Sequence, residues 1–139
     1  MAVVLVDTGP LVAFFRASEL HHEWAKTQFA ALDRPLLTCE PVVTEAAYLL
    51  SEHGSRPELL WELFRRSLLQ IAFDLESEVE RIDMLMRRYA NVPMDLADAC
   101  LVRMSELNRQ STVVTTDSDF DFYRRFGRQS IPTIQPDRT

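Results

Sequence analysis

The sequence predicts an α/β fold, with a central, mostly parallel, twisted sheet of about four to five short strands that helices cover on both faces. Short runs rich in β-branched residues, such as 2–6 and 112–115, have the near-continuous apolar character of buried strands. These runs alternate with segments whose apolar residues recur at helical spacing. Because strands that alternate with helices form parallel sheets with both faces covered, the pattern favours this architecture.

Proline and glycine positions set the expected boundaries of the elements. Pro41 and Pro57 stand where a first-turn helical proline belongs, and Gly54 stands where the helix that begins at Pro41 should end. Upstream, three residues at helical spacing should point inward: Trp24, Phe29 and Leu32. The expected helices cover 11–16, 21–32, 41–54, the segment from 57, 76–89 and the segment that follows Pro93 and runs to about 108, with a short helix or turn at 119–126. The expected strands cover 2–6, 36–38, 71–73, 112–115 and 132–134.

Residues 1–139 should form a single domain. With 139 residues, of which 47% are hydrophobic, the chain can build one core and has little room for a second. Cys39 and Cys100 lie in apolar sequence without the spacing of a zinc site, as expected for free, buried thiols in a reducing cytoplasm. No apolar stretch approaches the roughly 20 residues that span a bilayer, and no signal-peptide pattern precedes the first strand. We therefore expect a cytoplasmic protein without a membrane partner.

The formal net charge of −6 argues against nonspecific binding to polyanions, which depends mostly on excess lysine and arginine. If four acids serve as metal ligands, the remaining charge is only −2, so a nucleic-acid substrate is still compatible with the composition. Lys26 is the only lysine among 15 basic residues. Arginine suits bidentate contacts to phosphate, but a GC-rich genome also favours it.

Four carboxylates sit against apolar sequence with no lysine or arginine beside them. Asp7 and Asp117 directly follow predicted strands, at the edge where open α/β sheets bind their ligands. Glu45 and Asp98 lie on predicted helices and share a face with apolar residues three and four positions away. Both should therefore lean inward.

Carboxylates that converge in an apolar setting repel one another and lose hydration, so they need hydrogen bonds or a cation. Either their pKa values rise or divalent cations hold them ionised. Each acid alone also has a structural explanation. Asp7 and Asp117 could cap the helix or turn that follows them, and Glu45 could extend to solvent. The joint pattern outweighs these separate explanations.

Taken in order, the motifs around these acids resemble the PIN-domain nucleases, and in particular the VapC toxins. The motifs are Leu5–Leu11 at the end of the first strand, a glutamate one turn into the helix after Pro41, Asp95–Ala99, and Thr115–Phe120. The resemblance covers essentially the whole chain, including its length.

The resemblance implies four catalytic acids that bind Mg²⁺ or Mn²⁺: Asp7, Glu45, Asp98 and Asp117. Asp119 matches an acid that is often present beside the fourth position. Asp95 has two possible roles. It could lie at the rim of the site, or it could cap the helix, as an aspartate in a first turn often does. Thr8 and Thr116 flank the acids and could orient a water molecule or a phosphate.

The resemblance further implies a metal-dependent endoribonuclease that hydrolyses RNA, forms a homodimer and is neutralised as a toxin by a cognate antitoxin. Two alternatives are a PIN-like binding or regulatory module without turnover and a housekeeping PIN nuclease. A DNA-directed nuclease of related fold is a further alternative, because the acids do not distinguish the sugar. A phosphotransfer domain would need a second aspartate at position 9, where the sequence has Gly9.

Two surfaces have more than one interpretation. Arg124, Arg125 and Arg128 follow the Asp117 motif and could line an RNA groove, although arginine clusters are more often solvated faces. Apolar residues of the segment 41–67 form either the candidate antitoxin groove or part of the core: Leu59, Leu60, Trp61 and Phe64.

Overall fold

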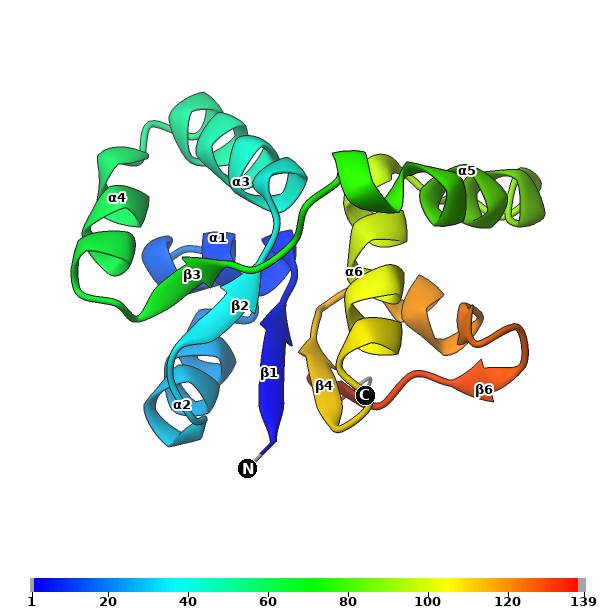
Figure 1. The fold of residues 1–139 in the computed structure, drawn as a ribbon. Coiled ribbons are helices and arrows are strands. Elements are labelled where there is room, and N and C mark those ends of the chain that lie inside the picture. Colours follow the sequence, from blue (N-terminus) through cyan, green and yellow to red (C-terminus); the bar gives the residue numbers. More distant parts are fainter. Residues whose placement is uncertain (1, 138–139) are drawn as a thin grey trace.

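The computed structural model describes residues 2–137 and contains a parallel sheet at its centre (Figure 1). Five strands lie in the order β3-β2-β1-β4-β7, and every neighbouring pair is parallel. Their bounds are β1 (Val3–Val6), β2 (Leu36–Thr38), β3 (Leu69–Ile71), β4 (Ser111–Val114) and β7 (Thr133–Ile134). The predicted α/β fold class is confirmed. Residues 1, 138 and 139 of the predicted domain lie outside the described part of the chain.

Helices connect the strands and begin at the expected signals. The Asp7 side chain caps the first helix, Pro41 lies in the first turn of the third, and Asp95 caps the sixth. The bounds are α1 (Thr8–Phe15), α2 (His22–Ala31), α3 (Glu40–Glu52), α4 (Glu58–Arg65), α5 (Val79–Arg88) and α6 (Leu96–Leu107). Two short 3₁₀ helices complete the set, η1 (Glu76–Glu78) and η2 (Ser118–Asp121).

The strand order diverges at β1. The chain passes from β1 through α1 and α2 to β2 on one side, whereas it returns from β3 through α5 and α6 to β4 on the other side. Right-handed crossovers, which nearly all parallel connections adopt, then put α1 to α4 on one face of the sheet and α5 and α6 on the other. Open α/β sheets bind ligands at such a divergence, at the carboxyl ends of the strands.

The strands β1 and β4 lie at the centre of the core. Leu5, Val6, Val113 and Val114 are all fully buried. The register pairs Val6 with Val114, so the residue after each strand end, Asp7 or its counterpart at 115, lies at the same level of the sheet. The apolar ladder thereby brings two loops with polar residues to one edge.

The C-terminal part and one inner strand differ from the sequence-based expectation. The third strand lies at Leu69–Ile71 instead of 71–73, because Leu69 supplies a buried side chain whereas Ala72 is exposed. The expected helix or turn at 119–126 is only partly helical. After η2 the chain forms a small antiparallel hairpin of β5 (Arg124–Arg125) and β6 (Gln129–Ser130).

Three further expectations can be compared with the structure. In α2 the fully buried side chain is Ala25, while Trp24, Phe29 and Leu32 are only partly buried against the core. Cys39 and Cys100 are free and buried, as expected. Within residues 2–137, no helix combines the length and apolar character required to cross a lipid bilayer.

Candidate metal centre

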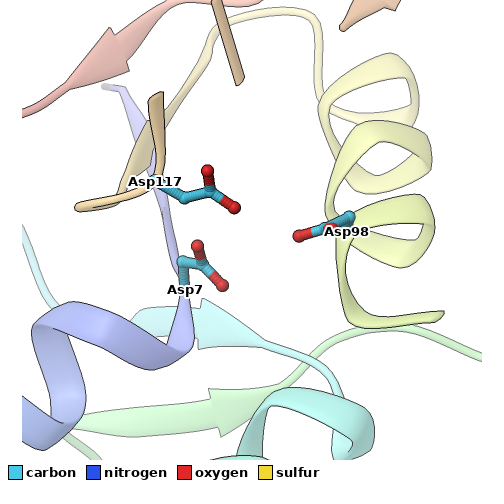
Figure 2. A group of neighbouring side chains, drawn as sticks. All are labelled: Asp7, Asp98 and Asp117. Atoms are coloured by element: carbon cyan, nitrogen blue, oxygen red, sulfur yellow. The ribbon is translucent and has the colours of Figure 1, made fainter. Parts of the chain in front are cut away.

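Three of the four predicted acids meet at the carboxyl edge of the sheet. Asp7, Asp98 and Asp117 each place one carboxylate oxygen within 4.8 Å of the others. Figure 2 shows Asp98 projecting from α6 toward Asp7 and Asp117. Asp7 follows β1, Asp117 follows β4, and Asp98 lies in the first turn of α6. Residues about 90 positions apart in sequence are therefore brought together by the strand order and by the helix that packs beside it.

Asp7 is held firmly in this cluster. Its side chain accepts a hydrogen bond from the Thr8 backbone N–H at 2.7 Å and another from the Thr115 hydroxyl at 2.7 Å. Only 6% of the residue is exposed. Burial raises the pKa of Asp7 to about 6, and the charges of Asp117 and Glu45 add to this effect, although both hydrogen bonds oppose it. Asp7 is thus a helix cap and a member of the cluster at once.

Thr115 joins two of the acids and was missed by the sequence analysis, which named its neighbours Thr8 and Thr116. The fully buried Thr115 hydroxyl donates to Asp7 Oδ2 and accepts a hydrogen bond from the Asp117 backbone N–H at 2.9 Å. The signal that could have found it is its position directly after a buried strand, opposite Asp7 in a parallel pairing.

Asp117 is also fixed by a local turn. Its Oδ1 atom accepts a hydrogen bond from the Asp119 backbone N–H at 2.8 Å, which caps η2. Burial raises the pKa of Asp117, and the charges of Asp119 and Asp95 contribute in the same direction. The carboxylate of Asp119 is half-buried beside the cluster but does not belong to the group of three converging oxygens.

Asp98 has the most strongly raised pKa of the three acids. Burial raises the pKa of Asp98 to about 8, and the charges of Asp95, Asp7 and Asp117 add to the rise. The side chain also closes a reciprocal capping box: Asp98 N–H donates to Asp95 Oδ1 at 2.8 Å, and Asp95 N–H donates to Asp98 Oδ2 at 3.2 Å. Asp95 therefore caps α6, and its charge helps to raise the pKa of Asp98.

Glu45 differs from its prediction as an inward-leaning acid. It is exposed, because the buried stripe of α3 consists of Val42, Ala46 and Leu50 at four-residue spacing, and Glu45 lies about 100° away from that stripe. Its carboxylate is outside the group of three. Partial burial and the charge of Asp95 nevertheless raise the pKa of Glu45, so Glu45 is close enough to the other acids to interact with their charges.

The two threonines that flank the acids occupy different environments. The Thr8 hydroxyl is buried and, among the described residues, makes no hydrogen bond of ordinary geometry, although it approaches Glu45 closely enough to lower the pKa of that group. Thr116 packs against Gly9, where an added Cβ would lie 2.0 Å from Thr116 Oγ1. Gly9 is therefore required by this close approach, a constraint that the sequence analysis did not identify.

The arginines of the C-terminal hairpin do not form one exposed cluster. Arg125, which we expected could line an RNA groove, is instead buried, with Nη1 donating to the Ser105 carbonyl at 3.1 Å and Nε to Gln129 Oε1 at 3.1 Å. Arg124 is half-buried, with Nη1 donating to the Asp121 carbonyl at 2.7 Å, and Arg128 is exposed.

The donor set fits a hard divalent cation. All three converging groups are carboxylates, the ligands that Mg²⁺ and Mn²⁺ prefer. Three carboxylates leave coordination positions on such an ion for water and for substrate oxygens. The raised pKa values of all three show that their negative charges are costly in this setting without a counter-ion. The buried Thr8 hydroxyl, next in sequence to Asp7, adds one more polar oxygen beside the cluster.

A long groove of about 990 Å³ adjoins this centre. It runs between α3, the chain from β3 to α5 and the start of α6, and it meets the acids at Glu45 and Asp95. Apolar side chains line much of it, among them Tyr48, Leu75 and Leu96, which are all exposed. An extended ligand could therefore reach the acids along this surface.

Comparison with known proteins agrees with the geometry. No curated protein matches the sequence significantly. Among solved structures, the fold is similar to VapC20 of Mycobacterium tuberculosis, described as a toxin that cleaves the sarcin–ricin loop, with a TM-score of 0.73 at 19% sequence identity over 84% of this chain and 91% of that chain. The PIN domain family model matches residues 4–125, which include all of the acids discussed above. The chain therefore belongs to the PIN domain family, as its motifs predicted.

Proposed function

We propose that the protein is a metal-dependent endoribonuclease that acts as a VapC-like toxin. The observation that carries the proposal is the convergence of Asp7, Asp98 and Asp117 at the point where the strand order diverges. Membership of the PIN domain family supports a nuclease. The shared fold with a toxin described as cleaving the sarcin–ricin loop supports RNA as the substrate class.

In this proposal Asp7, Asp98 and Asp117 hold Mg²⁺ or Mn²⁺, with Glu45 and Asp119 at the margin. A bound divalent ion lowers the pKa of a water molecule and stabilises charge on a phosphodiester oxygen. Hydrolysis by such a water needs no covalent intermediate on a protein side chain. The acids supply the charge and the coordination that position the reaction.

The surrounding residues keep these ligands in place. Thr115 fixes Asp7 through a hydrogen bond and restrains the backbone that carries Asp117. Asp95 fixes Asp98 through the capping box. The buried Thr8 hydroxyl has no partner of ordinary geometry within residues 2–137, so it can donate to a water molecule or to a phosphate oxygen. Rigid ligands of this kind lower the cost of assembling the site.

We also propose that a cognate antitoxin and a second copy of the chain bind to this protein. Of the apolar residues expected to form the antitoxin groove, Leu60 is fully buried and belongs to the core. Trp61 is 42% exposed, and with Phe64 it lines a surface hollow of about 500 Å³ between α3, α4 and β3. This hollow is the part of the segment 41–67 that remains a candidate antitoxin surface.

Cleavage of structured and single-stranded RNA with Mg²⁺ or Mn²⁺ tests the proposed activity. We expect wild-type protein to cleave, Asp7→Asn and Asp98→Asn to lose most of the activity, and chelation to abolish it. Asp33→Asn is a matched control, because Asp33 is exposed in the loop before β2, far from the carboxyl edge. Cleavage without metal, or full activity in both site variants, contradicts the mechanism. Metal binding without cleavage of any RNA supports a binding module instead.

A further inference from the structure

We infer that Tyr123 is a positioning residue that orients the carboxylate of Asp98 for cation binding. The inference rests on the proposed function, because it assigns Asp98 to a divalent-metal site. It adds a residue from the segment after η2, which lies outside the acidic motifs.

The geometry around the Tyr123 hydroxyl carries the inference. Tyr123 is fully buried, and its ring packs edge-on against Phe120 and Tyr89 at centroid distances of 5.1 Å and 5.2 Å. These contacts leave the ring little freedom to move. Its hydroxyl lies 3.2 Å from Asp98 Oδ2 and also contacts the Pro93 carbonyl. The packing of the aromatic rings therefore fixes the position of the hydroxyl beside Asp98.

Two protein groups approach the same oxygen of the Asp98 carboxylate. Asp95 N–H and the Tyr123 hydroxyl both approach Oδ2, at 3.2 Å each. With Oδ2 held in place, the rotation of the whole carboxylate is fixed, and so is the direction in which it can bind a cation. Hydrogen bonds of this kind to a ligating carboxylate set its rotation, and their loss typically costs about 10-fold to 100-fold in metal affinity.

A purely structural role makes a different prediction. A tyrosine hydroxyl has one proton to donate, and the Pro93 carbonyl alone could accept it. In that case removal of the hydroxyl would reduce stability without changing the affinity for metal. The distinction between the two roles therefore lies in metal binding and not in folding.

Calorimetric titration with Mn²⁺ separates these roles when wild type, Tyr123→Phe and Tyr89→Phe are compared. Tyr89 is a matched control: it is also buried, it belongs to the same aromatic stack, and its hydroxyl accepts a hydrogen bond from the Arg124 N–H at 2.8 Å. Both substitutions keep the ring and remove one buried hydroxyl. We expect Tyr123→Phe to weaken Mn²⁺ binding about 10-fold. This is the lower end of the range, because Asp95 N–H still holds Oδ2. Tyr89→Phe should bind Mn²⁺ with an affinity within about twofold of wild type.

Unchanged Mn²⁺ affinity in Tyr123→Phe, or an equal loss in Tyr89→Phe, overturns the inference. Failure of wild-type protein to bind Mn²⁺ overturns the proposed metal site itself, so the two failures are distinguishable. If Tyr123→Phe does not fold, carbon NMR of the labelled tyrosines in wild-type protein gives the same test with Mg²⁺. The Tyr123 signal next to the hydroxyl should then shift on saturation more than that of Tyr89, and an absent shift contradicts the inference.

Discussion

Replacement of Asp98 by asparagine should stabilise the metal-free protein at neutral and alkaline pH. The pKa of Asp98 rises from an ordinary value of 3.8 to about 8 in the folded state, mainly through burial and then through the charge of Asp95. Because the folded-state pKa exceeds that of the unfolded chain, the unfolded state is favoured as pH rises. The loss of stability begins above about pH 4 and is complete above about pH 8.

The size of this effect follows from the two pKa values. Each pKa unit corresponds to about 1.4 kcal/mol, so the upper bound is about 6 kcal/mol. Asp98 is only half-buried, and solvent screening reduces this value, so we expect a gain of about 2–4 kcal/mol above pH 8. Asparagine keeps an oxygen that can accept the Asp95 N–H, so the capping box need not be lost.

Urea unfolding with a chelator present, measured from about pH 4 to pH 9, checks this expectation. The free-energy difference between Asp98→Asn and wild type should be small or negative near pH 4 and should grow steadily above it. Added Mn²⁺ should stabilise wild type and leave the variant nearly unchanged, which reverses their order. A variant that is no more stable than wild type at pH 8 without metal would refute the reasoning that Asp98 bears an uncompensated charge.

Three further outcomes are expected. Mn²⁺ affinity in calorimetry should fall about 10-fold per pH unit between about pH 8 and pH 6, because the Asp98 proton must leave before the metal binds, and more steeply below about pH 6, where Asp7 is protonated as well. A flat profile would contradict this. Thr115→Val should reduce Mn²⁺ affinity about 10-fold to 100-fold by freeing the Asp7 carboxylate, whereas Thr115→Ser should retain most of it. Glu106→Gln should lower the urea-derived stability by up to about 3–5 kcal/mol, because it leaves the half-buried Arg81 without the charge of its buried partner. Unchanged stability would show that this ion pair is dispensable.

The sequence predicted the fold and most of the site for identifiable reasons. Asp7 follows a continuous apolar run, and such runs place their next polar residue at the edge of a parallel sheet. Asp98 has no basic partner nearby in sequence, and in the structure it bears the most strongly raised pKa of the clustered acids. These residues were predictable because their role depends on local pattern and strand direction.

Other features depend on contacts between distant segments and were not predictable from pattern. Glu45 shares apolar neighbours with the buried stripe of α3, but a rotation of about 100° on the helix places it outside the cluster. Tyr123 meets Asp98 only because the chain after η2 folds back under α6. Arg125 resembles a surface arginine in sequence, yet the Ser105 carbonyl accepts its hydrogen bond in the interior.

The proposed function depends above all on a divalent-metal site formed by Asp7, Asp98 and Asp117. Anomalous diffraction from a crystal soaked with Mn²⁺ tests it most directly, because the signal locates the ion without reference to any assay. We expect a peak within bonding distance of carboxylate oxygens from these three residues. A crystal that shows no peak there, at a Mn²⁺ concentration that supports RNA cleavage in solution, would contradict the account.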